Sequence, residues 1–142
     1  MTQPSASCAR PLGPPIDVAA AVIIRDGQVL LARRVGGALD GLWEFPGGKM
    51  EPGESAPAAV EREIFEELHL RVRARHRVLV LEHDYPDKTV RLHFVTCSLL
   101  PEPPAATPAH ETGWFTPAGF PWAEFCPADL IAARHLPWGE LL

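Results

Sequence analysis

Three glutamates are spaced so that they share one face of a predicted helix: Glu63, Glu66 and Glu67. Residues three and four positions apart are neighbours on a helix surface, where like charges repel each other. Carboxylate oxygens gathered beside an irregular loop provide the ligands that suit Mg²⁺ or Mn²⁺. The alternative for such a triplet is a solvated acidic face that binds nothing.

The segment before this helix, "FPGGKMEPGE" at residues 45–54, contains two glycines and two prolines and is predicted to be a loop. Glycine permits unusual dihedral angles and adds no side chain, so a Gly-Gly turn should let backbone carbonyls approach the glutamates. Arg62 lies beside Glu63 in sequence and can brace a carboxylate, and Glu54 at the start of the helix can reach Arg62. Loop and helix together therefore favour a metal site over a solvated face.

The stretch from Gly48 to Leu70 resembles the Nudix box, G-x5-E-x7-R-E-U-x-E-E-x-G-U, where U is a bulky aliphatic residue. The matching residues are Gly48, Glu54, Arg62, Glu63, Ile64, Glu66, Glu67 and Leu70. One position departs, because His69 stands where the family has the glycine that ends the helix in a left-handed conformation. Histidine tolerates that conformation better than most residues, and the departure should cost ~1 kcal/mol without removing a ligand.

The resemblance implies an α+β fold in which helices flank a mixed central sheet, an α/β/α sandwich. It implies that the Gly48 carbonyl and the three helix glutamates bind Mg²⁺, with Mn²⁺ as a substitute, and that Glu54 and Arg62 support them. It implies an enzyme that cleaves a nucleoside diphosphate linked to another group, with metal ions clamping phosphate oxygens and activating water. Glu111, before the last strand, matches a further metal-site or general-base glutamate, the alternative being an ordinary loop charge.

Several stretches outside the box resemble the MutT-type subgroup: "LLARR", "LWEFPGGKMEPGE", "YPDK", "GWFTP" and "FCPAD". The subgroup hydrolyses nucleoside triphosphates, notably 8-oxo-dGTP, to the monophosphate and pyrophosphate, which cleans the nucleotide pool and serves DNA repair. A CTP or 5-methyl-dCTP pyrophosphohydrolase is the alternative within the family. A hydrolase of ADP-ribose or sugar nucleotides is less favoured, because those enzymes carry extra N-terminal strands. A catalytically silent nucleotide-binding module is also disfavoured, because the box glutamates are all present.

Four residues are candidates for substrate contact: Arg34, Lys49, Tyr85 and Asp129. By resemblance, Arg34 reaches the substrate and Tyr85 lies near the base pocket; the alternatives are a surface charge and a hairpin-turn tyrosine. Asp129 stands in "PAD" where the oxidised-guanine enzymes often carry a base-contacting asparagine, and the motif also resembles the cytosine-nucleotide enzymes. An ionised aspartate only accepts hydrogen bonds, which suits guanine and cytosine amines and excludes the thymine or uracil O4. Alternatively, Asp129 is a first-turn residue favoured by the helix dipole.

Composition bounds the class of protein. The chain of 142 residues carries a net charge of -5, which is not typical of nucleic-acid binders, since those usually show a basic stripe. A substrate with phosphates would be repelled unless metal ions or local arginines intervene. Three cysteines without metal-ligand spacing indicate a reduced compartment. An apolar signal segment is not recognisable in the printed sequence, and we expect no transmembrane helix because no apolar run approaches the length that one needs. The predictions are a cytoplasmic enzyme with a small nucleotide substrate, no direct nucleic-acid or membrane binding, and a monomeric or homodimeric state.

The elements that must position these residues follow from turn signals and hydrophobic periodicity. A Pro-rich flexible arm is predicted at residues 1–17 and a single domain at 18–142. Helices are predicted from Ser55 to about His69, with Val60, Ile64 and Leu68 buried, and at 127–136. Strands are predicted at residues 18–25, 28–34, 43–45, 71–85, 88–100 and 112–116. In the strand at 88–100, His93 should face outward, and Trp43, Trp114 and Trp122 should serve packing.

Overall fold

The computed structural model describes residues 13–101 and 110–142. The predicted arm falls largely in residues 1–12, which lie outside the described residues, as do residues 102–109. The single-domain boundary at residue 18 stays a prediction, although the first strand begins two residues earlier. None of the helices in the described ranges combines the length and apolarity needed to cross a membrane.

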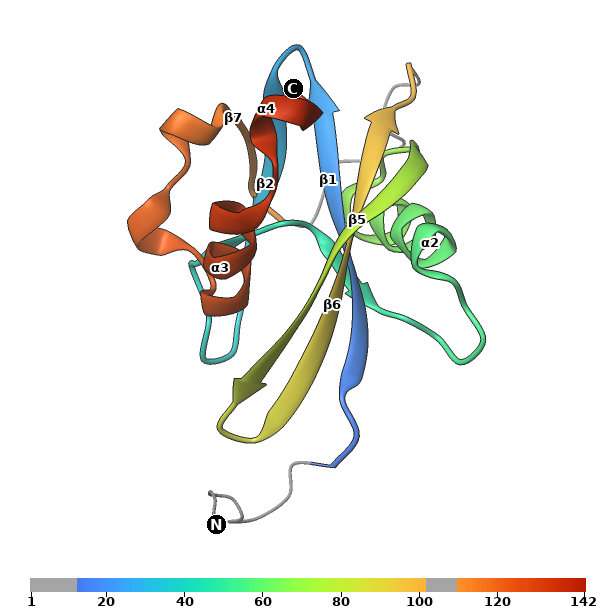
Figure 1. The fold of residues 1–142 in the computed structure, drawn as a ribbon, viewed down its shortest axis with the longest axis vertical. Coiled ribbons are helices and arrows are strands. Elements are labelled where there is room, and N and C mark those ends of the chain that lie inside the picture. The colour runs from blue at the N-terminus through green and yellow to red at the C-terminus, as the bar shows by residue number, and fades with distance from the viewer. Residues whose placement is uncertain (1–12, 102–109) are drawn as a thin grey trace.

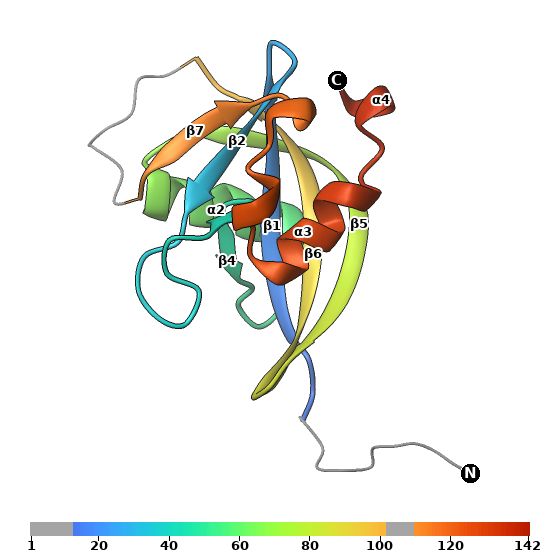
Figure 2. The same cartoon turned by 90° about the vertical axis from the view of Figure 1, so that its left-hand side faces the viewer.

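A mixed sheet forms the middle layer, and helices cover both of its faces, as Figures 1 and 2 show. The expected α+β sandwich is therefore confirmed. The strands are β1 (Ile16–Arg25), β2 (Gln28–Arg33), β3 (Trp43–Glu44), β4 (Gly47–Lys49), β5 (Val72–Tyr85), β6 (Lys88–Leu99) and β7 (Thr112–Phe115). The helices are α2 (Ala56–Leu68), α3 (Pro127–His135) and α4 (Trp138–Leu141), with 3₁₀ turns at Pro117–Gly119 and Trp122–Glu124. Strand β4 and helix α4 were not predicted.

Strand β1 lies at the centre of the sheet because its residues are small and apolar on both faces. It pairs parallel with β6 and antiparallel with β2 and β4. One core cluster lies on the α2 face and includes Ala19 and Ile64, and the other lies on the α3 face and includes Phe94 and Ala132. The β1–β2 turn follows the Asp-Gly signal, since Asp26 and Gly27 both have positive φ.

Helix α2 follows from its own sequence. The Ser55 hydroxyl accepts from the Ala58 N–H at 3.2 Å, and Val60, Ile64 and Leu68 are buried. His69 ends the helix at φ 55°, ψ 30°, and its N–H bonds the Phe65 carbonyl at 3.0 Å. The predicted start, stripe and left-handed end are all confirmed.

The outward orientation predicted for His93 is wrong. Val90, Leu92 and Phe94 do face one core, but the His93 side chain, on the opposite face, is only 8% exposed. Its Nε2 lies 2.8 Å from Asp17 Oδ1 on the adjacent strand β1. Alternation finds the two faces of a strand, but it does not show that a neighbouring strand provides a buried partner.

Candidate active site

Arg62 lies at the centre of the acidic face of α2. Its Nε and Nη2 donate to the two oxygens of Glu54 at 2.7 and 2.8 Å. Its Nη1 also reaches Glu63 Oε2 and Glu66 Oε1, each at 3.0 Å, and Nη2 donates to the Lys49 carbonyl at 3.1 Å. These bonds to Arg62 hold the pKa of Glu54 at about 2, so Glu54 is an ionised anchor that joins the loop to the helix.

Gly47 and Gly48 do not form the turn with unusual dihedral angles that was predicted from the sequence. Neither has a positive φ, and both lie in strand β4, which pairs with β1 at Ala19 and Ala20. A Cβ on Gly47 would overlap the Ala19 carbonyl oxygen, and a Cβ on Gly48 would overlap the Glu63 carboxylate. The two glycines are therefore required for close packing of β1 and Glu63 rather than for an unusual backbone conformation.

A cavity of about 800 Å³ opens beside this helix. Among its lining residues are Gly47, Gly48 and Glu67 from the loop–helix segment and Tyr85 and Asp129 from β5 and α3. The cavity thus places part of the predicted metal site and part of the predicted base pocket in one space, which is large enough for a drug-sized ligand.

Glu67 is the box glutamate that lines the cavity. Burial, together with the negative charges of Glu63 and Glu44, raises the pKa of its carboxyl to about 7. The raised pKa shows that the ionised form of Glu67 is poorly stabilised by its surroundings. A bound divalent cation would supply the missing positive charge. The oxygen-only donors at Glu63, Glu67 and the Gly48 carbonyl fit a hard cation such as Mg²⁺.

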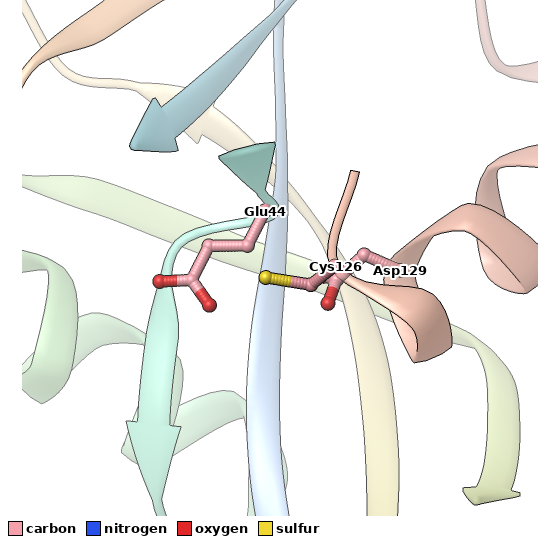
Figure 3. Close-up of side chains that lie close together, drawn as sticks. All are labelled: Glu44, Cys126 and Asp129. Carbon is pink, nitrogen blue, oxygen red and sulfur yellow. The ribbon is translucent and has the colours of Figure 1, made fainter. Parts of the chain in front are cut away.

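The three helix glutamates do not converge to ligand distance in this structure. Arg62 binds both Glu63 and Glu66, and Glu66 stays largely exposed. A different set of side chains meets that criterion within the described ranges. One ligand atom each from Glu44, Cys126 and Asp129 lies within 4.8 Å of the other two (Figure 3). The ligand role of Glu63, Glu66 and Glu67 stays a prediction.

Asp129 lies in the first turn of α3 and is 5% exposed. Its Oδ1 accepts from the Phe45 N–H at 3.0 Å. Burial, and next the charge of Glu44, raise the pKa of Asp129 well above its usual value. Burial therefore disfavours the ionised Asp129 that was expected from the sequence. In its protonated form the carboxyl group can donate a hydrogen bond as well as accept one. The helix-turn and pocket positions predicted as alternatives coexist.

The other predicted substrate residues divide between the cavity and its surroundings. Arg34 lines the cavity and pairs with Glu44, Nη1 to Oε1 at 3.1 Å. Lys49 and Tyr85 also line it, and the Tyr85 hydroxyl contacts the backbone of Ala128. Glu111 does not line the cavity. Its side chain is 61% exposed, and its Oε1 lies 3.4 Å from Arg33 Nη1. The surroundings of Glu111 thus resemble those of the ordinary loop charge that was its alternative.

Glu44 is the site residue that sequence reasoning missed. It lies on the short strand β3, pairs with Arg34, and acts on the pKa values of both Glu67 and Asp129. Burial raises the pKa of Glu44 itself, and Arg34 opposes that rise. Alternation along a strand separates Glu44 from the rings of Trp43 and Phe45, but nothing near Glu44 in sequence indicates its partners.

Comparisons with known proteins agree with this geometry. A sequence model of the NUDIX domain matches residues 15–138. A CTP pyrophosphohydrolase of Escherichia coli (strain K12) is 42% identical over 79 residues, 55% of this chain and 58% of that protein. An 8-oxo-dGTP diphosphatase of Proteus vulgaris is 36% identical over 81 residues, 56% of this chain and 72% of that protein. The solution structure of the E. coli ORF135 protein superposes with a TM-score of 0.69 at 31% identity, over 84% of this chain and 86% of that one.

Proposed function

Because the chain belongs to the NUDIX domain family, we propose that it is a divalent-metal-dependent nucleoside triphosphate pyrophosphohydrolase. The reaction converts a ribo- or deoxyribonucleoside triphosphate and water to the monophosphate and pyrophosphate. One observation carries this proposal: a single cavity is lined both by Glu67 beside Gly48 and by the buried carboxyl of Asp129. A nucleotide needs such a pair of subsites, one for its phosphates and one for its base.

The phosphate end is formed by β4 and α2. Glu63, Glu66, Glu67 and the Gly48 carbonyl would hold Mg²⁺, which supplies the charge that neutralises phosphate oxygens and lowers the pKa of a bound water. Arg62 fixes Glu63 while Glu54 fixes Arg62, so the carboxylates meet the substrate already oriented. Lys49 and Arg34, which line the cavity, are placed to attract phosphates to an otherwise acidic site.

The base end is formed by Asp129 with Phe45. A protonated Asp129 offers a donor beside an acceptor, as an amide does. That pattern complements guanine O6 with N1–H and also cytosine N3 with its amine. The donor of a protonated Asp129 could also bond the O4 acceptor of thymine or uracil, so these bases are not excluded, as they would be by an ionised carboxylate.

We favour oxidised guanine nucleotides such as 8-oxo-dGTP as the preferred substrates, which makes the proposed role the cleaning of the nucleotide pool. Cytosine nucleotides are the second candidate, because the match to the CTP pyrophosphohydrolase has the higher identity of the two relatives. The choice between them rests on the base subsite alone, since both reactions use the same phosphate chemistry.

The test is a panel of nucleoside triphosphates, normal and oxidised, with Mg²⁺, compared by kcat/KM and by product. Pyrophosphate with a monophosphate supports the proposal, and the base with the highest kcat/KM identifies the substrate class. ADP-ribose or a sugar nucleotide giving a sugar phosphate and a nucleoside monophosphate, with triphosphates left intact, would contradict it. Binding of nucleotides without turnover of any of them would instead indicate a silent module.

A further inference from the structure

We infer that Glu44, Cys126 and Asp129 form a second cation site, with a thiolate among its ligands, that takes Zn²⁺-class ions in preference to Mg²⁺. The Cys126 sulfur lies between the two carboxyl groups in Figure 3. One ligand atom from each residue lies within 4.8 Å of the other two. This set shares no residue with the predicted magnesium ligands.

The three side chains come from separate segments and are held in place by the fold. Glu44 is on β3, Cys126 precedes α3, and Asp129 is in its first turn. The Cys126 N–H bonds the Trp43 carbonyl at 2.9 Å, and Asp129 accepts from the Phe45 N–H. These two bonds fix α3 against both neighbours of Glu44, so the three groups form a built cluster rather than a chance approach of mobile side chains.

The Cys126 thiol supplies the second observation that points to a ligand. It is 1% exposed, it lines the cavity, and within residues 13–101 and 110–142 it makes no hydrogen bond to another residue. A buried group with bonding capacity that bonds no other residue needs an explanation. A thiolate is a soft ligand that selects zinc over magnesium, so the donor set separates this site from the hard oxygen site on α2.

The distances and charges fit such an ion with a small adjustment. Zinc with sulfur at about 2.3 Å and oxygen at about 2.1 Å brings ligand atoms roughly 3.5 Å apart. Because the ligand atoms here all lie within 4.8 Å of one another, the side chains need to approach by at most about 1.3 Å. Arg34 holds Glu44 through Oε1 and would orient it from outside. Three anionic ligands, one divalent ion and the Arg34 guanidinium together carry no net charge.

Binding requires deprotonation, and the protons leave to solvent. Burial raises the pKa of the Cys126 thiol to about 12, so the thiol is protonated before the ion arrives. Burial also raises the pKa of Asp129 well above its usual value, which favours its neutral form. The ion replaces the proton on the Cys126 sulfur and any proton that Asp129 holds, and each displaced proton leaves to solvent.

A cation bound at this site should affect the binding of a nucleotide substrate. This effect on the substrate is the one part of the inference that rests on the proposed function. The ion would lie where Asp129 is proposed to read the base, so cation and nucleotide should exclude each other. A zinc-class ion would then inhibit the enzyme by competing with the base, while Mg²⁺ at the α2 site would not.

The experiment titrates the full chain, freed of metal by chelation, with Co²⁺ as the probe in Mg²⁺-free buffer. Thiolate-to-cobalt charge transfer absorbs in the near ultraviolet and reports only an ion bound to sulfur. We expect this band in the wild type, its loss in Cys126→Ser, and its retention in Cys97→Ser, which alters the other buried free cysteine. A Cys8→Ser control removes the remaining thiol, and it too should keep the band.

Glu44→Gln keeps the thiol and provides a second variant if Cys126→Ser fails to fold. It should weaken Co²⁺ binding about tenfold or more, as loss of even a supporting group does, and Zn²⁺ should displace Co²⁺. A wild type without the band, or a band that survives both variants, would overturn the site. If the band is present but triphosphates in excess leave it unchanged, the proposed competition is wrong. Because the band needs no turnover, failure of the proposed enzymatic function would show separately.

Discussion

The guanidinium of Arg62 holds the carboxylate of Glu54 through two parallel hydrogen bonds of 2.7 and 2.8 Å. The same guanidinium bonds Glu63 and the Lys49 carbonyl. Arg62 of α2 therefore joins the end of β4, the loop before α2 and a predicted metal ligand. Lysine cannot reproduce this planar fork.

Arg62→Lys should lower kcat/KM about 10- to 100-fold, the effect typical of groups that orient metal ligands. The apparent affinity for Mg²⁺ should fall with it, because Glu63 loses its orientation. Steady-state kinetics over a Mg²⁺ titration measure both quantities. Arg73→Lys on the exposed part of β5 is the matched control and should leave both unchanged. Equal kinetics in the two variants would contradict the positioning role of Arg62.

Glu67→Gln should lower kcat severely while the fold is retained, because the amide is nearly isosteric but a weaker cation ligand. Chelation of divalent ions should abolish wild-type activity, and Mg²⁺ or Mn²⁺ should restore it. Activity assays and thermal melts of wild type and variant check these outcomes. Full activity in excess chelator, or a Glu67→Gln enzyme with nearly normal kcat, would contradict the metal role.

Asp129→Asn should preserve stability and change the ranking of bases far more than it changes Mg²⁺ dependence, because the amide resembles the protonated acid but cannot ionise. Asp129→Ala removes the acceptor of the Phe45 N–H and should cost about 1–3 kcal/mol of stability. It should also raise KM for the best base and flatten the ranking. The measurement is kcat/KM across the nucleotide panel together with denaturant unfolding. If both variants keep the wild-type order of bases, Asp129 serves only the structure.

Gly47→Ala should destabilise the protein by about 1–3 kcal/mol, the range for forcing extra atoms into a packed interior. The new Cβ would overlap the backbone carbonyl of Ala19, and a paired strand cannot move aside as a side chain can. Gly139→Ala is the control, because nothing lies within 4 Å of a Cβ built there. Unfolding in urea compares the two, and equal midpoints would show that the β1–β4 contact tolerates a methyl group.

Stability at low pH should depend on Asp17. Its hydrogen bond with His93 lowers the pKa of Asp17 below the usual 3.8, so the stabilisation is present above about pH 4. It is lost as pH falls through the lowered pKa of the folded state. Asp17→Asn should therefore flatten the decline of unfolding free energy between about pH 5 and pH 2. Urea titrations at several pH values test this, with Asp87→Asn as an exposed control; identical slopes for Asp17→Asn and wild type would refute it.

The features determined by the sequence alone are those formed by residues near each other along the chain. Helix α2 was predictable because its cap, its buried stripe and its left-handed end are encoded within residues 55–69. The Asp26–Gly27 turn is equally local. Arg62 and Glu54 are eight residues apart, so their pairing also follows once the loop meets the helix, and the box pattern pointed to the enzyme family.

Tertiary structure decided everything that depends on packing between distant segments. Phe45 and Asp129 are 84 positions apart, and their contact creates the buried pocket wall that includes Glu44 and Cys126. The raised pKa of Asp129 follows from that burial and from the charge of Glu44, and neither cause can be read from "PAD". His93 forms a hydrogen bond with Asp17, which lies 76 positions away in sequence. Gly47 is required because the β1 backbone packs directly against it. A local pattern specifies an element, but burial, pKa and the lining of a cavity are set by whatever the completed fold packs against each side chain.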